Sequence, residues 1–94
     1  MELTFEWGEE KAKTNLNNHQ VSFEEAKTVF NDPLLLTFPD PDHSDTEERY
    51  LNIGYSSQGR ILVVIHTERE EAIRIISCRR ATPKERRVYE QGDY

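Results

Sequence analysis

Two adjacent arginines, Arg79 and Arg80, stand where a strand pattern gives way to a helix start, and they are the first candidates for chemistry in this chain. The preceding residues 73–76 are rich in β-branched side chains, which is typical of a packed strand. Residues 82–85 read Thr-Pro-Lys-Glu, which predicts a capped helix with proline in its first position. Guanidinium groups held rigidly at a strand end are suited to binding phosphate. The alternative is a solvated strand end whose charges pair with Glu85.

Alternation of side chains decides which arginines can act together. In a strand that stays extended to its end, Arg79 and Arg80 point to opposite faces of the sheet. Arg80 then shares a face with Arg74, whereas Arg79 aligns with Ser77 and Ile75. The sequence therefore predicts that Arg74 and Arg80 lie on one face.

Charge is distributed unevenly along the 94 residues, whose net charge is −6. Residues 1–59 hold 4 basic and 12 acidic side chains, whereas residues 60–87 hold 8 basic and 4 acidic ones. Broad nonspecific binding of nucleic acid requires a basic surface over the whole domain, and this balance argues against it. A local basic pocket, or a docking surface for an oppositely charged partner, fits the distribution.

Length and composition predict a single domain over residues 1–94, with 35% hydrophobic and 32% charged residues. No apolar run approaches the roughly 20 residues of a membrane-spanning helix, and residues 1–7 lack the pattern of a signal peptide. The one cysteine, Cys78, has no partner for an internal disulfide, which fits a reducing cytoplasm. We expect Cys78 to be packed within its strand and not to act as a nucleophile.

The periodicity of apolar residues predicts the order strand, two helices, three or four strands and a final helix. The expected helices are 9–18, 23–30 (capped by Ser22, with Glu25 completing a capping box) and 83–90, and the expected strands are 3–7, 34–38, 48–55, 60–66 and 72–79. Residues 39–45 are expected to form an acidic loop, and residues 67–71 a hairpin connection. The predicted fold is α+β, with helices on one face of an antiparallel sheet of about four to five strands. Its other face stays partly open or binds a partner.

The runs FEWGEEKAKTN, VSFEEA, IGYSSQGR and RIISCRRATPKER together resemble the BrnT family of bacterial toxin–antitoxin ribonucleases, from Leu3 to about Glu90. The resemblance implies a small RelE-like toxin that cleaves RNA without a metal ion or other cofactor and inhibits translation and growth in the cytoplasm. It also implies a hetero-oligomer with a BrnA-like antitoxin, whose ribbon-helix-helix part binds operator DNA, so that the toxin touches DNA only through that complex. One departure is Gly8, where the family usually has Asp.

Metal-independent RNA cleavage requires a base for the 2′-hydroxyl proton, cations for the phosphate and an acid for the departing 5′-oxygen. We expect Glu48 to be the base, with Glu68 as its substitute, and His66 to assist proton transfer. Arg79 and Arg80 complete this catalytic set, because the RRAT segment that contains them matches the motif of the family. The alternatives are surface carboxylates and a structural histidine bonded to the backbone.

Four further residues are expected to bind the substrate. Arg60, at a hairpin tip, is predicted to hold a second phosphate, unless it is only an exposed turn residue, and Arg74 is a further substrate-binding residue. Lys11 and Asn15 share one face of the first helix and match a spacing of the family. They are expected to contact RNA or the antitoxin, unless they form only a polar helix surface.

No metal site is expected. The acidic loop 40–45 lacks the glycine and the distal glutamate of an EF-hand, and the chain has no pair of histidines or cysteines at a ligand spacing. Residues 9–10 and 40–48 are instead candidates for docking basic residues of the antitoxin. The rival function is a noncatalytic interaction domain that keeps the fold but has lost nuclease activity, and the Gly8 departure favours it.

Overall fold

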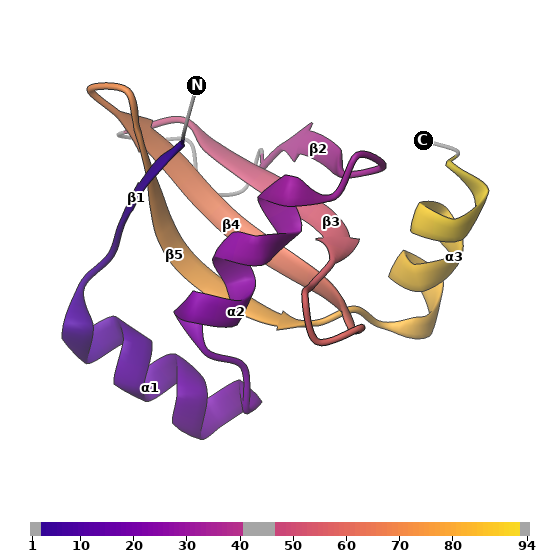
Figure 1. Ribbon diagram of the computed structural model, residues 1–94, viewed down its shortest axis with the longest axis horizontal. Helices are drawn as coiled ribbons and strands as arrows, with labels where there is room; N and C mark the ends of the chain where they lie inside the picture. Colours follow the sequence, from indigo (N-terminus) through magenta and orange to yellow (C-terminus); the bar gives the residue numbers. More distant parts are fainter. Residues whose placement is uncertain (1–2, 41–46, 93–94) are drawn as a thin grey trace.

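The computed structural model describes residues 3–40 and 47–92, and Figure 1 shows the arrangement of their helices and strands. Along the chain the elements are β1 (Thr4–Glu6), α1 (Glu9–His19), α2 (Phe23–Lys27), the 3-10 helix η1 (Thr28–Asn31), β2 (Leu36–Pro39), β3 (Arg49–Tyr55), β4 (Ile61–Arg69), β5 (Ala72–Arg80) and α3 (Pro83–Gln91). The predicted α+β class is confirmed, with element ends that shift by a few residues. Most of the predicted acidic loop and of the acidic docking segment 40–48 lies outside the described residues. No helix in the described ranges is long and apolar enough to cross a membrane.

The five strands form one sheet in the order β1-β5-β4-β3-β2. β2 to β5 pair antiparallel as predicted, but β1 lies parallel to β5, with Phe5 opposite Ile73. The sheet is therefore mixed. This difference arises because the first and last strands of the chain are neighbours in space, a contact that the periodicity of either strand does not encode.

One face of the sheet carries the main core. Helix α2 and η1 cross this face, and α1 packs beside β5 (Figure 1). Phe23 and Val29, both almost fully buried, pack against Leu62, Val64 and Ile75 of the sheet. Burial of these apolar side chains is the main source of stability for the domain.

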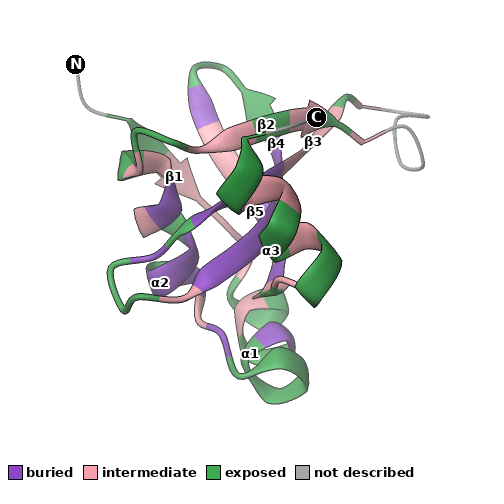
Figure 2. Cartoon of the chain, turned by 90° about the vertical axis from the view of Figure 1, so that its right-hand side faces the viewer, coloured by how far each residue is buried: buried purple, intermediate pink, exposed green. Residues whose placement is uncertain are grey.

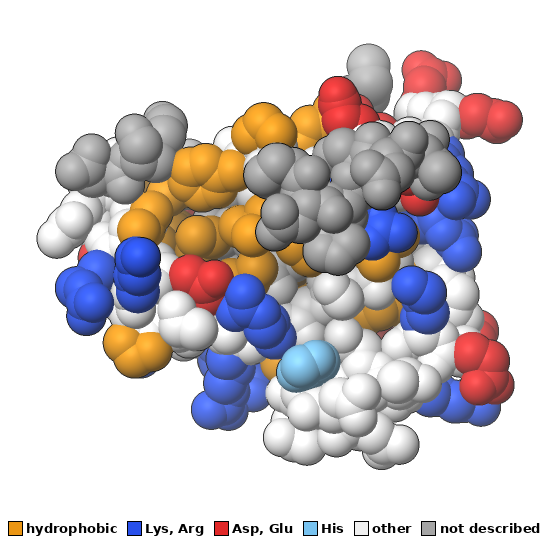
Figure 3. Space-filling view, turned by 180° about the vertical axis from the view of Figure 1, so that it is seen from behind, with side chains coloured by type: hydrophobic (Ala, Val, Ile, Leu, Met, Phe, Trp, Pro, Cys, Tyr) orange, Lys and Arg blue, Asp and Glu red, His pale blue; other side chains and the backbone are white. Residues whose placement is uncertain are grey.

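The opposite face is covered only in part, by α3 (Figure 2). Tyr89 of α3 packs on the cluster of Ile53, Ile61 and Val63, and its hydroxyl donates a 2.6 Å hydrogen bond to Asp32. Away from α3 this face exposes an apolar patch with Lys and Arg side chains beside it (Figure 3). The partly open face that the sequence predicted is therefore the face of the sheet opposite the main core.

A bulge in β5 breaks the alternation of its side chains. Ser77 lies opposite Ile65, whereas Ile75 lies opposite His66, so that Ile76 is an extra residue in the strand. A bulge of this kind bends the strand and redirects the side chains around it.

The bulge makes the predicted pairing of arginines wrong. Arg74 lies opposite Thr67 and Arg79 lies opposite Val63. Thr67 and Val63 are four residues apart on a regular strand, so Arg74 and Arg79 share a face and Arg80 points to the other one. The extra residue at the bulge reverses the alternation on which the prediction rested.

The β4–β5 hairpin is tighter than predicted. β4 continues to Arg69, and only Glu70 and Glu71 form the turn, with φ of 47° and 75°. Two consecutive left-handed residues are the signature of a type I′ turn, which usually contains Asn and Gly. The strands therefore meet at a strained, acidic tip.

Candidate functional site

Glu48, the predicted base, and His66, the predicted proton-transfer residue, lie at the same end of β3 and β4. We call this region, which also includes Tyr50 and Glu68, the carboxylate end. His66 is 3% exposed, and its Nδ1 accepts a 2.8 Å hydrogen bond from the Asn52 side-chain amide. The ring proton is then on Nε2, which lies 3.4 Å from a Glu68 carboxylate oxygen. Burial lowers the pKa of His66, although Glu68 opposes this effect. His66 is thus held as a buried, neutral and fully bonded side chain.

Tyr50 closes this end of the sheet over His66. The two rings stack with centroids 5.0 Å apart, and the Tyr50 hydroxyl donates a 3.1 Å hydrogen bond to Glu48. This bond to a carboxylate raises the pKa of Tyr50. Glu48 and His66 are therefore linked through Tyr50 and do not face a common open space.

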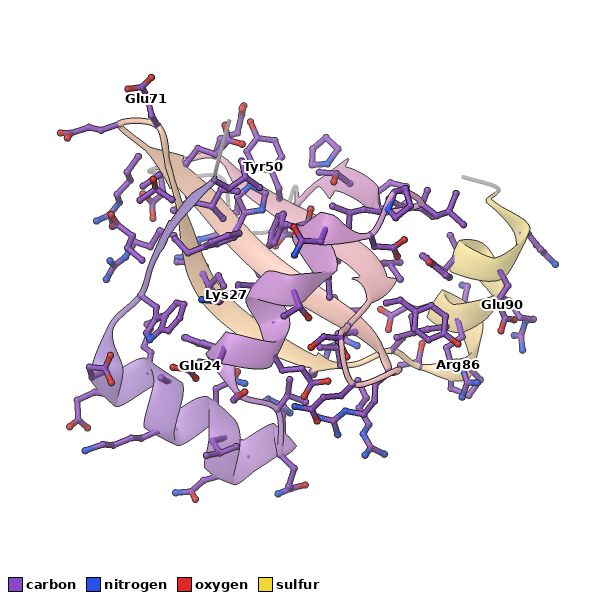
Figure 4. All side chains as sticks on the ribbon, in the orientation of Figure 1. Glu24, Lys27, Tyr50, Glu71, Arg86 and Glu90 are labelled. Atoms are coloured by element: carbon purple, nitrogen blue, oxygen red, sulfur yellow. The ribbon has the colours of Figure 1, made fainter. Side chains whose placement is uncertain are left out.

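The predicted phosphate-binding arginines lie elsewhere. Arg79 pairs in register with Val63, three residues before His66 on β4, which corresponds to about 10 Å along the strand and to the opposite face. Figure 4 shows the same separation, with Tyr50 and Glu71 at one end of the molecule and Arg86 at the other. The structure does not bring Glu48 and His66 together with Arg79 and Arg80, whereas Arg74 lies opposite Thr67, the residue after His66 in β4.

Arg79 is held by α3. Its guanidinium forms two parallel hydrogen bonds to Glu85, of 2.8 and 3.0 Å, and Glu85 also accepts a 2.8 Å bond from the backbone of Thr82. The predicted capping box of α3 is confirmed, and the alternative of pairing with Glu85 is also correct. The bonds from Arg79 lower the pKa of Glu85. The bonds to Glu85 fix the direction of the Arg79 guanidinium. Because the side chain is still 39% exposed, it also remains accessible to a ligand.

Arg60 is held by a buried carboxylate. Glu25 is 3% exposed, binds Arg60 through both of its oxygens and accepts a 2.6 Å hydrogen bond from the Ser56 hydroxyl. The bonds from Arg60 lower the pKa of Glu25. Ser22 caps α2 as predicted, but the Glu25 carboxylate accepts its bonds from Arg60 and not, as a capping box requires, from the backbone of Ser22. Arg60 is therefore an anchored residue of the turn, with 24% of its side chain exposed.

Asn15 anchors α1 to the sheet. Because β1 ends at Glu6, the backbone of Cys78 has no strand neighbour on the outer edge of β5. The Asn15 side chain takes that place, since it donates a 2.9 Å hydrogen bond to the Cys78 carbonyl and accepts a 3.1 Å bond from the Cys78 amide. It also donates to the Val21 carbonyl at 3.0 Å. Asn15 is buried and positions α1, although it also lines a hollow beside α1.

The anchored helix and the bulge together form a groove. Lys11 and His19 of α1 line a hollow of about 380 Å³ with Ile76 and Ser77. Ile76 and Ser77 also line a second hollow of about 280 Å³, together with Arg49 and Arg79. Ile76 and Ser77 are consecutive in β5, and both line the groove at the bulge, where Ile76 is the extra residue.

We call these two hollows together the open-face groove. Its charged and polar lining includes the cations Lys11, Arg49 and Arg79, the carboxylates Glu10 and Asp40, and Asn15, His19 and Ser77. The Nε atom of Arg49 is buried and makes no hydrogen bond to any residue in the described ranges. Cations, an exposed imidazole and a hydroxyl in one groove can bind a phosphodiester and transfer protons to and from it.

The sequence analysis missed His19, Arg49 and Ser77. A signal for His19 was present, because Lys11, Asn15 and His19 are spaced four residues apart and lie along one face of α1. Arg49 and Ser77 carried no such signal, since only the strand register and the bulge bring them to this groove.

Arg80 and Arg60 line a different hollow, of about 320 Å³, with Arg86 and Tyr55. We call it the arginine cleft. Arg74 lies in neither place. It pairs with Glu6 at 3.0 Å, and a Cβ atom on Gly8 would lie 3.7 Å from its guanidinium, so the family's Asp would fit here.

Cys78 is buried as predicted, and this burial raises the pKa of its thiol to about 12. Among the described residues, no group of three or more His, Cys, Asp and Glu side chains is arranged to hold a metal ion.

Known proteins with a similar sequence or structure indicate the family of this chain. Residues 7–85 match the family model described as the ribonuclease toxin, BrnT, of type II toxin–antitoxin systems. The crystal structure of the ribonuclease toxin BrnT of Brucella abortus is similar to this chain, with a TM-score of 0.68 and 25% sequence identity over 86% of this chain and 99% of that one. No curated protein sequence matches the chain significantly.

Proposed function

The chain belongs to the family of BrnT ribonuclease toxins of type II toxin–antitoxin systems, and from this premise we propose that it cleaves RNA in the open-face groove. In this proposal, residues 1–94 act as one domain, and the reaction is an endoribonuclease cleavage that needs no metal and inhibits translation and growth. The observation that carries it is the convergence of Lys11, Arg49 and Arg79 with His19 in one groove. A groove lined by these cations attracts the phosphates of RNA.

The chemistry follows from these side chains. His19 accepts the proton of a 2′-hydroxyl, whose oxygen then attacks the adjacent phosphorus. Arg49 and Arg79 stabilise the negative charge that grows on the phosphate oxygens. The 5′-oxygen leaves with a proton from an acid in the groove, and the products carry a 2′,3′-cyclic phosphate and a 5′-hydroxyl. Arg79 is suited to this role because Glu85 fixes its direction before RNA binds.

We assign Glu48, Glu68 and His66 to stability in place of catalysis. His66 is buried, and its two ring nitrogens face Asn52 and Glu68. A base must reach the proton that it abstracts, and in this geometry His66 cannot do so without a rearrangement of Tyr50. Catalysis of RNA cleavage by these three residues is therefore less well supported than catalysis by the residues of the open-face groove.

The proposed partner is a BrnA-like antitoxin with a ribbon-helix-helix part that binds operator DNA. The support is an apolar patch on the open face of the sheet (Figure 3). Leu51 and Ile65, which line the groove, are only half buried. An exposed apolar surface with a charged border is typical of a protein interface. An antitoxin bound there covers the groove, and the complex acts in the cytoplasm, where the RNA substrate is.

Cleavage by the purified protein tests the proposal. A defined RNA is incubated with it in the presence of EDTA, and the ends of the products are analysed. We expect cleavage with 2′,3′-cyclic phosphate ends, and growth arrest when the chain is expressed in a bacterium. Folded protein that leaves RNA intact with and without divalent cations, and does not affect growth, contradicts the proposal and favours the noncatalytic interaction domain.

A further inference from the structure

We propose that the arginine cleft is a second RNA subsite, which binds one nucleotide beyond the open-face groove. Its phosphate lies among Arg60, Arg80 and Arg86, and its base stacks on Tyr55. This inference rests on the proposed ribonuclease function and deepens it, since it specifies how the enzyme selects single-stranded RNA longer than the cleaved step.

The position of the cleft supports a continuous RNA path. Arg79 lies in the groove and Arg80 in the cleft, and the two are consecutive residues at the end of β5. Their side chains point to opposite faces of the sheet, so the two sites lie on either side of one strand end. A flexible single strand that passes around this end contacts both.

The charges in the cleft are arranged for an anion. Arg60 is held in place by Glu25, whose carboxylate is buried and already bonded. Arg80 and Arg86 are exposed, and neither forms an ion pair with any residue that the structure describes. One fixed and two available guanidinium groups around a hollow of about 320 Å³ form a site for a phosphodiester.

Tyr55 makes a nucleotide a better fit than an acidic peptide. Its side chain is 47% exposed, although the ring packs against that of Tyr89 with centroids 5.8 Å apart. An acidic peptide needs only the arginines, whereas a single-stranded nucleotide uses both the cations and an exposed aromatic ring.

Binding of an uncleavable RNA provides the test. The probe is a fully 2′-O-methylated oligonucleotide of about ten nucleotides, and its affinity for the full chain is measured by fluorescence anisotropy at several salt concentrations. We expect Arg86→Gln to weaken binding about tenfold and to reduce the slope of log affinity against log salt by about 0.7, as for one lost phosphate contact. Tyr55→Leu is expected to weaken binding about tenfold without changing this slope.

Arg87→Gln is the matched control, because Arg87 is an exposed residue of the same helix and does not line the cleft. We expect it to change neither the affinity nor the slope appreciably. Equal effects of Arg86→Gln and Arg87→Gln overturn the proposal, since they indicate only a general loss of charge. An Arg86→Gln variant that binds RNA normally but binds the antitoxin weakly also overturns it, and assigns the cleft to the protein partner.

Cleavage assays separate this inference from the function on which it rests. With a dinucleotide, which reaches only the groove, Arg86→Gln is expected to cleave at the wild-type rate. With the longer RNA it is expected to raise KM about tenfold and leave kcat unchanged. If wild-type protein cleaves no RNA, the proposed function fails while the anisotropy result still stands. Normal KM on the longer RNA for both Arg86→Gln and Tyr55→Leu removes the subsite and leaves the function intact.

Discussion

The open-face groove and the carboxylate end each contain a histidine, and the two histidines differ in burial and in hydrogen bonding. His66 is buried, stacked under Tyr50 and bonded through both ring nitrogens. His19 is exposed at the end of α1, in a groove that also contains Arg79. Residue type alone suggests catalysis for both, but a side chain that is fully bonded in the folded protein is available for neither substrate nor proton transfer. The comparison therefore assigns chemistry to the groove and stability to the carboxylate end.

The largest expected effect comes from removing the two strand-end arginines. Arg79→Ala combined with Arg80→Ala is expected to lower kcat/KM for RNA cleavage about 10³-fold, because both the transition-state charge and the bound phosphate lose a cation. The control is Arg69→Ala combined with Arg87→Ala, which removes the same charge outside the groove and the cleft. Circular dichroism checks that both variants fold. Equal activity of a folded Arg79/Arg80 variant and the control contradicts the assignment of chemistry to this end of the sheet.

Loss of Asn15 is expected to lower the stability of the domain, because Asn15 anchors the helix that lines the groove. Asn15→Ala removes three hydrogen bonds to the backbone and one to the Cys78 sulfur, and leaves the backbone of Cys78 unpaired in a buried position. We expect the free energy of unfolding, measured with urea, to fall by about 3 kcal/mol. Asn18→Ala, on the same helix but exposed, is expected to change it by less than about 0.5 kcal/mol. A small effect of Asn15→Ala would show that α1 does not depend on this anchor.

The buried state of His66 predicts a pH dependence of stability at the carboxylate end. Burial lowers its pKa below the ordinary value of 6.5, so the unfolded chain takes up the proton first as the pH falls. The stabilisation is fully present above about pH 6.5 and is lost as the pH falls through the folded pKa. Glu68 opposes this shift, and Tyr50 covers the ring without a charge of its own near neutral pH.

Urea unfolding at several pH values measures this dependence. Between about pH 7 and pH 5, stability of the wild type is expected to fall more steeply than that of His66→Gln, which has no group to titrate there. Parallel curves for the two proteins would show that His66 is as easily protonated in the folded state as in the unfolded chain.

The smallest effect is expected at the hairpin tip of the carboxylate end. Glu71 has a φ of 75°, which favours glycine, so Glu71→Gly is expected to raise the free energy of unfolding by about 1 kcal/mol. Glu71→Gln keeps the backbone strain and removes only the charge, and thus separates the two causes. RNA cleavage is expected to be unchanged in both, since the tip lies at the far end from Arg86 (Figure 4). A loss of cleavage in Glu71→Gln would bring the carboxylate end back into the mechanism.

The sequence predicted those parts of the molecule that depend on local pattern. Thr82 and Glu85 form the expected capping box, and the two longest strands lie where apolar and β-branched residues are concentrated. The same kind of reasoning predicted that Cys78 is packed, because it stands within an apolar strand.

The site was predictable only in part, because it depends on contacts between distant residues. The extra residue Ile76 reverses the face of every side chain beyond it, and no local signal announces it. Asn15 was predicted to contact RNA or the antitoxin because it matches a spacing of the family, and that spacing gives no sign of its bonds to Cys78, 63 residues away, which anchor the helix. Glu25 likewise fits a capping box in sequence and pairs with Arg60 in the fold.

The most direct test of the contrast between the two regions is the cleavage rate of His19→Gln and His66→Gln. Both are assayed under saturating RNA, at a temperature where circular dichroism shows each variant to be folded. The account predicts that His19→Gln lowers kcat about 10²-fold, the usual contribution of a general base or acid, while His66→Gln retains nearly the wild-type kcat. The reverse result, with His66→Gln inactive and His19→Gln active, would contradict the account and place the chemistry at the carboxylate end.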